Sequence, residues 1–128
     1  MKCWSLFNEY FISEIHPNME GLRAEEFMEG VKRRFAKSLL DVLILKLVSR
    51  KPTWGYKLIS ILKEAYGVKV GPSVLYPLLN RLEGEGFVSS RTEFRGRRRR
   101  RVYEITEKGL ELLAAYGDFL RAELNTVP

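Results

Sequence analysis

Five consecutive arginines, Arg97 to Arg101, restrict the fold of this chain more than any other feature. Five adjacent cations cannot enter a hydrophobic core, and they repel one another unless a polyanion neutralises them. Two segments are expected to form strands, 87–94 before the run and 98–105, which contains its last four arginines, and the two meet at Arg95 and Gly96. This pattern predicts an exposed β-hairpin that carries arginines at its tip and along its return strand.

The segment before the hairpin predicts a short helix that begins at Gly71 and Pro72, because proline is tolerated in the first turn. Its apolar stripe has the three- and four-residue spacing of a helix face that packs on a core: Leu75, Leu78, Leu79 and Leu82. Its opposite stripe is small or polar: Ser73, Tyr76, Pro77 and Asn80. With Ser73 as the N-cap, Pro77 is expected to remove one backbone hydrogen bond without breaking the helix.

Two helices are expected upstream. Apolar residues recur every four positions from Val31 to Leu47, which predicts one long first helix that buries a wide stripe. Pro52 is expected to end this helix, and Thr53 is placed to cap the next one, which runs to Gly67. The resulting helix pair and polar-faced third helix, followed by a basic hairpin, have the layout of a winged helix-turn-helix.

We therefore predict a mainly α fold with a small β-hairpin, divided into three parts. Residues 1–29 form an acidic helical arm or connector with net charge −4, residues 30–105 form the winged domain with net charge +12, and residues 106–128 form a terminal helix with net charge −2. The acidic ends are better suited to dimer contacts than to a shared anion. The apolar side chains expected at the dimer interface are Leu113, Tyr116, Phe119, Leu120 and Leu124, with Trp4, Phe7 and Phe11 from the arm.

The basic middle part predicts binding to double-stranded DNA. Residues expected to contact bases or the groove are Ser73, Tyr76, Pro77, Asn80 and Arg81. Residues expected to contact phosphates are Arg91, Arg95, Arg97, Arg98, Arg99, Arg100 and Arg101 of the hairpin, with Lys32 and Arg33 of the first helix. A symmetric dimer would place two such helices on an inverted-repeat operator, with half-sites about one DNA turn or a multiple apart.

Three sequence blocks resemble the PadR family of transcriptional regulators: WGYKLISIL, GPSVLYPLLNRLEGEGFV and GRRRRRVYEITEKGLELL. They stand in the family's order and at similar spacing, and the resemblance extends roughly over residues 35–124. It implies a homodimeric DNA-binding repressor that often releases its operator when a small molecule binds. A dimer cavity for such an effector would be lined by Trp4, Phe7, Tyr116 or Phe119, although core packing is an alternative use of these rings.

Other features exclude several classes. The one cysteine permits no internal disulfide, and no apolar run reaches the roughly 20 residues of a membrane span, so we expect a cytoplasmic protein without a membrane partner. No metal-ligand cluster, cofactor motif or catalytic constellation is found in the sequence, which predicts that the chain is not an enzyme. Two alternatives stay open, an RNA-binding module and a protein-interaction module without operator specificity.

Overall fold

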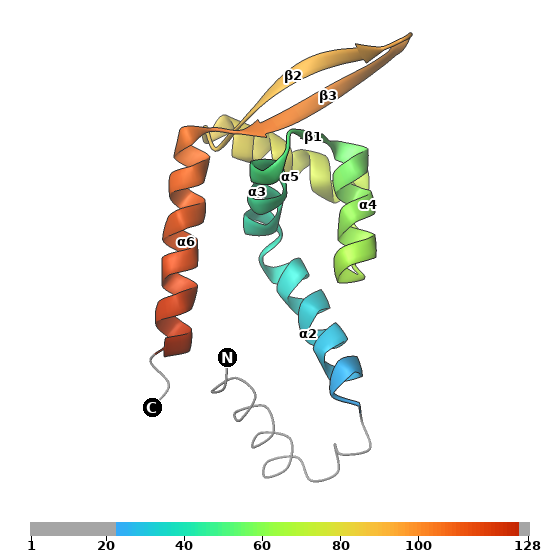
Figure 1. The fold of residues 1–128 in the computed structure, drawn as a ribbon. Coiled ribbons are helices and arrows are strands. Elements are labelled where there is room, and N and C mark those ends of the chain that lie inside the picture. Colours follow the sequence, from blue (N-terminus) through green and yellow to red (C-terminus); the bar gives the residue numbers. More distant parts are fainter. Residues whose placement is uncertain (1–22, 126–128) are drawn as a thin grey trace.

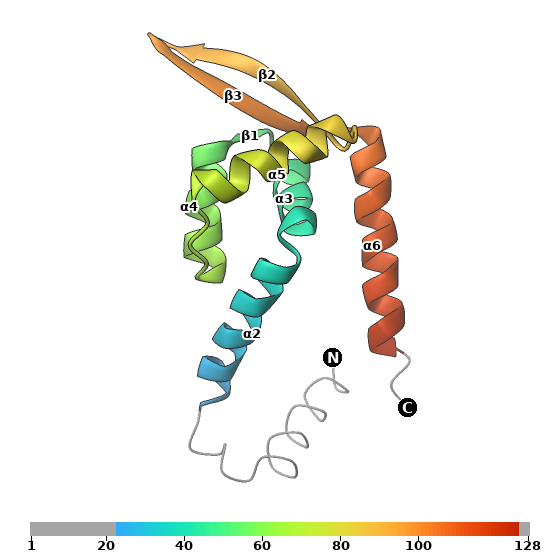
Figure 2. The same ribbon diagram turned by 180° about the vertical axis from the view of Figure 1, so that it is seen from behind.

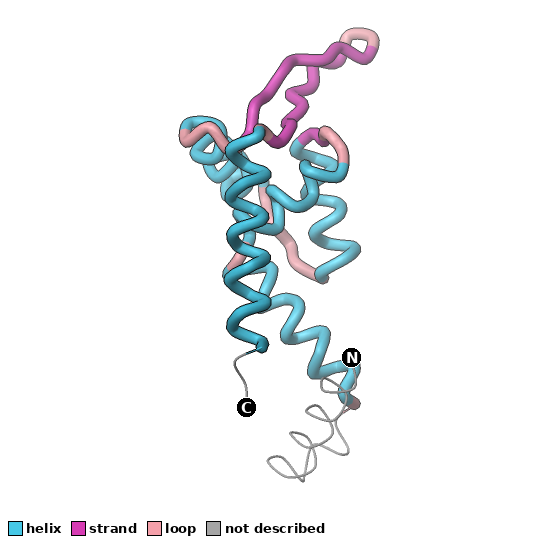
Figure 3. Tube along the Cα trace, turned by 60° about the vertical axis from the view of Figure 1, so that its left-hand side comes forward, coloured by secondary structure: helices cyan, strands magenta, loops and turns pink. Residues whose placement is uncertain are grey.

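The computed structural model describes residues 23–125 of the 128-residue chain. The elements in chain order are α2 (Ala24–Ser38), α3 (Leu40–Arg50), β1 (Thr53–Trp54), α4 (Gly55–Tyr66), α5 (Pro72–Gly84), β2 (Val88–Arg95), β3 (Arg98–Ile105) and α6 (Glu107–Asn125). Helices α3, α4 and α5 form a body beneath the β2–β3 hairpin (Figures 1 and 2). Helices α2 and α6 run from this body toward the end of the molecule opposite the hairpin (Figure 3). This is the winged helix that the sequence predicts, mainly helical with a small antiparallel sheet.

The hydrophobic core lies between α3, α4, α5 and the base of the hairpin. Its most deeply buried large side chains are Ile44, Leu45, Val48, Leu58, Leu62, Leu75, Leu79, Val88 and Tyr103. The predicted inner stripe of α5 is confirmed, since Leu75, Leu79 and Leu82 are buried and Leu78 packs at the edge of the core. Burial raises the pKa of the Tyr103 phenol, against an opposite and smaller effect of the nearby Arg101 guanidinium.

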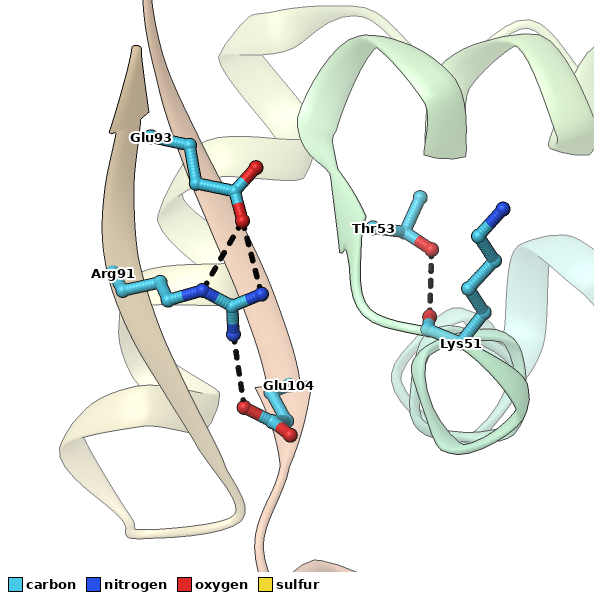
Figure 4. A network of polar contacts seen from close by, with 5 residues as sticks. All are labelled: Lys51, Thr53, Arg91, Glu93 and Glu104. Carbon is cyan, nitrogen blue, oxygen red and sulfur yellow. Dashed lines mark hydrogen bonds and ion pairs between the residues drawn. The ribbon is translucent and has the colours of Figure 1, made fainter.

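The sheet contains a third strand that the sequence analysis did not predict. Strand β1 pairs antiparallel with β3, with Thr53 opposite Tyr103 and Trp54 opposite Val102, which gives the order β1-β3-β2. Thr53 is therefore not the cap of α4. Its hydroxyl donates a hydrogen bond of 2.7 Å to the Lys51 carbonyl (Figure 4), and Trp54 takes the N-cap position.

The predicted long first helix is wrong, because the chain bends at Leu39 between α2 and α3. A four-residue repeat advances by about 40° per step around a helix of 3.6 residues per turn, so it drifts by about 160° between Val31 and Leu47. One straight helix could not bury the whole row. In α2 only Ala36 is buried and Phe35 is exposed, whereas α3 carries its own buried stripe. Helix α2 also begins at Ala24, so the expected boundary after residue 29 falls inside it.

Helix α5 starts as expected at Pro72, but Gly71 and not Ser73 is the N-cap residue. The Gly71 carbonyl accepts hydrogen bonds from the backbone N–H groups of Val74 and Leu75 at 3.1 and 3.0 Å. Pro77 lies inside the helix, which continues unbroken to Gly84. The prediction that Pro77 costs one hydrogen bond without ending the helix is confirmed, since Pro77 has no backbone N–H to donate to Ser73 and the helix continues past it.

The start of α6 is locked against the end of α5. Thr106 caps α6, since its hydroxyl oxygen accepts the Gly109 N–H at 3.1 Å. The same hydroxyl donates to the Gly86 carbonyl at 2.6 Å. Gly109 packs so tightly that a Cβ atom would lie 2.2 Å from the Phe87 carbonyl oxygen. A side chain at this position would therefore push α6 away from the body.

Gly109→Ala is expected to lower the free energy of unfolding by about 1–3 kcal/mol, the typical range for overpacking. Gly117→Ala on the same helix is the matched control. A Cβ there would meet only the flexible Arg121 side chain, at 3.4 Å or more, and alanine favours the helix by about 1 kcal/mol over glycine. Chemical denaturation of both variants checks the prediction; equal effects of the two substitutions would contradict it.

Candidate nucleic-acid interface

The outer face of α5 is open to solvent. Ser73, Pro77, Asn80 and Arg81 are all exposed, as the sequence predicts. Arg81 also lies 4.0 Å from the Asp41 carboxylate of α3, a long contact that leaves most of its side chain accessible. These four residues can therefore reach a ligand that approaches α5 from outside.

Tyr76 differs from the other predicted contact residues because it is half-buried between two helices. Its ring covers Gly55 at the start of α4, where a Cβ atom would come within 2.5 Å of the Tyr76 hydroxyl oxygen. Glycine at position 55 thus leaves the space that the tyrosine ring occupies. Tyr76 joins α4 to α5 and presents only part of its surface outward.

Val74 of α5 and Tyr56 of α4 are exposed but were not among the predicted contacts. Val74 is 56% exposed on α5, three residues before Pro77 and seven before Arg81, so the helical spacing places it beside the predicted outer stripe. Tyr56 is 71% exposed on the first turn of α4. The spacing to Pro77 could have identified Val74, whereas Tyr56 resembles any core aromatic until the orientation of α4 is known.

The two strands of the hairpin split the arginine run between two faces. Successive side chains of a strand point to opposite faces, so Arg99 and Arg101 share one face of β3 while Arg98 and Arg100 share the other. Gly96 takes a left-handed φ of +62° in the turn, with Arg97 following it at the tip. Backbone pairing of Arg95 with Arg98 closes the turn.

Three of the hairpin arginines are already engaged within the chain. Arg91 lies between two carboxylates and forms ion pairs of 3.0 Å with both Glu93 and Glu104 (Figure 4). Arg101 forms an ion pair of 2.8 Å with Glu83 of α5. The Arg100 guanidinium lies over the Trp54 ring, 4.4 Å from its centroid. These contacts neutralise or hold part of the cationic surface.

The other hairpin arginines are exposed and have no ion pair with any residue of the 23–125 range: Arg95, Arg97, Arg98 and Arg99. They lie at and next to the tip, where the hairpin extends beyond the helical body (Figures 1 and 2). Unpaired cations at the tip of a projecting hairpin are available to the phosphates of a nucleic acid.

The structure does not bring Lys32 and Arg33 to the hairpin. Lys32 pairs with Glu29 at 3.1 Å, and the aliphatic part of Arg33 packs beside Gly67, at the end of α4. The start of α4 adjoins the sheet through β1, and twelve helical residues at 1.5 Å each separate its two ends by about 18 Å. These two cations therefore belong to a different part of the surface from the hairpin arginines.

Helix α6 is poorly covered by its own chain. Gly109 is its one buried residue within the described part, and Leu113 packs at the edge of the core. Tyr116 and Leu120 are half-buried, whereas Phe119 and Leu124 are 57% and 66% exposed. Leu110 and Leu112 are exposed as well, so apolar side chains lie on more than one side of the helix. The predicted arm contacts Trp4, Phe7 and Phe11 lie outside the described residues.

Over residues 23–125, no cluster of three or more potential metal ligands occurs. Every buried side-chain nitrogen and oxygen in that range has a hydrogen-bond partner. None of the helices in the range has the length and apolar character needed to cross a membrane.

Comparison with known structures gives the same fold. A PadR family transcriptional regulator from Eggerthella lenta shares 26% identity at a TM-score of 0.65, with 80% of this chain and 90% of that protein covered. A PadR-like transcriptional regulator from Bacillus cereus shares 28% identity at a TM-score of 0.64, with coverage of 73% and 92%. PadR of Bacillus subtilis, whose structure was solved in complex with operator DNA, shares 31% identity at a TM-score of 0.57, with coverage of 61% and 46%.

A comparison of the chain with curated proteins found no match. Residues 44–115 match the sequence model of the family described as transcriptional regulator PadR-like, which is more than half of the chain and includes α4, α5 and the hairpin. Members of this family are regulators of transcription and not enzymes. The sequence resemblance, the winged-helix architecture and this match agree, and the chain belongs to the PadR-like family of transcriptional regulators.

Proposed function

We propose that this chain is a homodimeric repressor that binds a specific inverted-repeat site in double-stranded DNA. The observation that carries the proposal is the position of two surfaces at one end of the domain. Helix α5, whose outer residues are exposed, lies next to the base of the hairpin, and the hairpin extends beyond the helical body with its unpaired arginines (Figures 1 and 2). One surface suits a groove and the other suits phosphates.

Sequence selectivity is assigned to α5. Asn80 can form two hydrogen bonds with an adenine edge, and Ser73 can bond a base or a phosphate. Val74 adds an apolar group of a size that fits the methyl group of thymine. Tyr76 has a smaller part in this proposal than the sequence suggested, because much of its ring packs over Gly55.

Affinity is assigned chiefly to the hairpin. Arg95, Arg97, Arg98 and Arg99 are the proposed phosphate contacts, whereas Arg91 and Arg101 are held by carboxylates of the same chain. Phosphate contacts supply affinity that depends steeply on salt and carries no sequence information. Lys32 and Arg33 are not included, because α2 leads away from the hairpin (Figure 1).

Dimerisation is assigned to α6, because this helix leaves Phe119 and Leu124 largely exposed in the single chain. A two-fold dimer would present two copies of α5 to two half-sites, which accounts for the inverted repeat. The proposal of repression rests on the Bacillus subtilis relative, whose structure was solved in complex with operator DNA. Release by a small molecule stays a prediction of the family resemblance.

Selection of bound fragments from a pool of random DNA duplexes tests the proposal. We expect enrichment of an inverted repeat with half-site centres about 10 base pairs or a multiple apart. Enrichment of a single unrepeated site would contradict the dimeric proposal, and no enrichment would contradict sequence specificity. Competition by an RNA duplex of the same sequence distinguishes the RNA-binding alternative, because α5 cannot enter the deep, narrow major groove of A-form RNA.

A further inference from the structure

Three polar side chains connect the hairpin to the end of α5. The Arg101 Nη2 atom of β3 lies 2.8 Å from Oε1 of Glu83 in the last turn of α5, and the Arg101 Nε atom donates to the Ser90 hydroxyl oxygen of β2 at 2.9 Å. The Ser90 hydroxyl in turn donates to the other carboxylate oxygen of Glu83. The three groups close a ring of hydrogen bonds across three elements, which we term the wing brace.

The wing brace contains the one ion pair in the described chain that joins the hairpin to a helix, between Arg101 and Glu83. Arg91 on the opposite face of the hairpin pairs only with hairpin carboxylates, so it does not restrict the hairpin relative to the body. Glu83 is 28% exposed at its side chain, which shields its bonds from water more than those of a fully exposed pair. The Arg101 guanidinium donates to both Glu83 and Ser90, and the Glu83 carboxylate accepts from both Arg101 and Ser90. Two contacts on each group fix the relative orientation of the two groups.

We propose that Glu83 is a positioning residue for DNA binding, and that through Arg101 and Ser90 it sets the angle between the hairpin and α5. The inference deepens the proposed function and rests on it. Without the brace, the hairpin would be held by the pairing of β1 with β3 and by the Arg100 guanidinium over the Trp54 ring, and its tip beyond these contacts would move most. The tip carries the unpaired arginines, so their distance from a DNA backbone depends on the angle that the brace fixes.

Glu83→Ala provides a test in which two explanations predict opposite signs. Removing a carboxylate from a DNA-binding surface should raise affinity if only charge matters, since DNA is a polyanion. If Glu83 positions the hairpin, affinity should fall about 5- to 30-fold, equivalent to one or two lost phosphate contacts at about fivefold each near 0.15 M salt. Glu83→Gln, which keeps an oxygen acceptor for Arg101, should give an intermediate affinity.

Glu85→Ala is the matched control, because Glu85 is two residues away and exposed, and its side chain forms no ion pair within the described residues. This variant should bind the selected duplex at least as tightly as the parent protein. Affinities are measured by fluorescence anisotropy with the duplex enriched by selection. An affinity of Glu83→Ala equal to or above that of Glu85→Ala would overturn the inference.

A measurement without DNA separates failure of this inference from failure of the proposed function. Spin labels at Arg97→Cys in the hairpin tip and Lys46→Cys on α3 report the tip-to-body distance. The native cysteine is removed by Cys3→Ser, and excess unlabelled protein ensures that a dimer carries labels on one chain. Glu83→Ala should broaden the distance distribution, and Glu85→Ala should leave it unchanged. An unchanged distribution in Glu83→Ala would overturn the inference even if the protein bound no duplex.

Discussion

Replacing Arg97, Arg98 and Arg99 together by alanine is expected to lower the affinity of one protomer for a half-site of the selected duplex about 150-fold near 0.15 M salt, and the affinity of the dimer for the full repeat by more. A phosphate contact changes the slope of log affinity against log salt by about 0.9, which corresponds to about fivefold per contact at that concentration. The three side chains have no ion pair in residues 23–125, so their loss leaves no carboxylate unpaired and the hairpin pairing remains. The slope should fall by up to about 2.7 for one half-site and up to about 5.4 for the full repeat, which binds two protomers.

The control for this triple variant removes three cations from α2, at Lys32, Arg33 and Lys37. It changes the net charge by the same amount, so a purely global electrostatic effect would weaken binding equally in both proteins. We expect the α2 variant to keep most of the affinity and nearly the whole salt slope, because α2 leads away from the hairpin. Equal losses in the two variants would contradict the assignment of the phosphate contacts to the hairpin.

The hairpin and helix α5 were predictable because each depends on a short, local pattern. Gly96 supplies the turn, and the leucine spacing from Leu75 to Leu82 needs only helical periodicity to identify the buried side. Pro72 marks the start of α5 for the same local reason. Two of the three sequence blocks that carry the family resemblance contain these segments.

The features that sequence reasoning missed depend on tertiary contacts. Strand β1 has two residues, too few for any periodicity, and it exists because β3 offers a free edge to Thr53 and Trp54. The bend at Leu39 is hidden by a row of apolar residues that reads as continuous.

The arginine run reads in the sequence as one group of equivalent cations. Its division into paired and unpaired side chains depends on which carboxylates the fold brings close. Glu83 and Glu104 are remote in sequence from Arg101 and Arg91 respectively, and only the strand register and the end of α5 place them together. The pattern of adjacent residues therefore shows where the cations are but not which of them remain free.

A charged residue on the exposed apolar side of α6 is expected to abolish the dimer. Phe119→Glu should cost the single chain little, because the side chain is 57% exposed and packs mainly near Tyr116, at a ring-centroid distance of 6.4 Å. In a dimer the same carboxylate would be buried without a partner, which is strongly unfavourable. Sedimentation equilibrium should therefore show a monomer, and thermal denaturation should show that this monomer is still a folded domain.

Loss of the dimer should lower affinity for the full inverted repeat about 100-fold or more, because two linked half-sites gain about 10²–10⁴ over one. Affinity for an isolated half-site should stay unchanged. Ala114→Glu introduces the same charge at an exposed position five residues before Phe119, about 140° around the helix from it. This control should remain a dimer. A dimeric Phe119→Glu protein that binds the full repeat normally would place the dimer interface elsewhere.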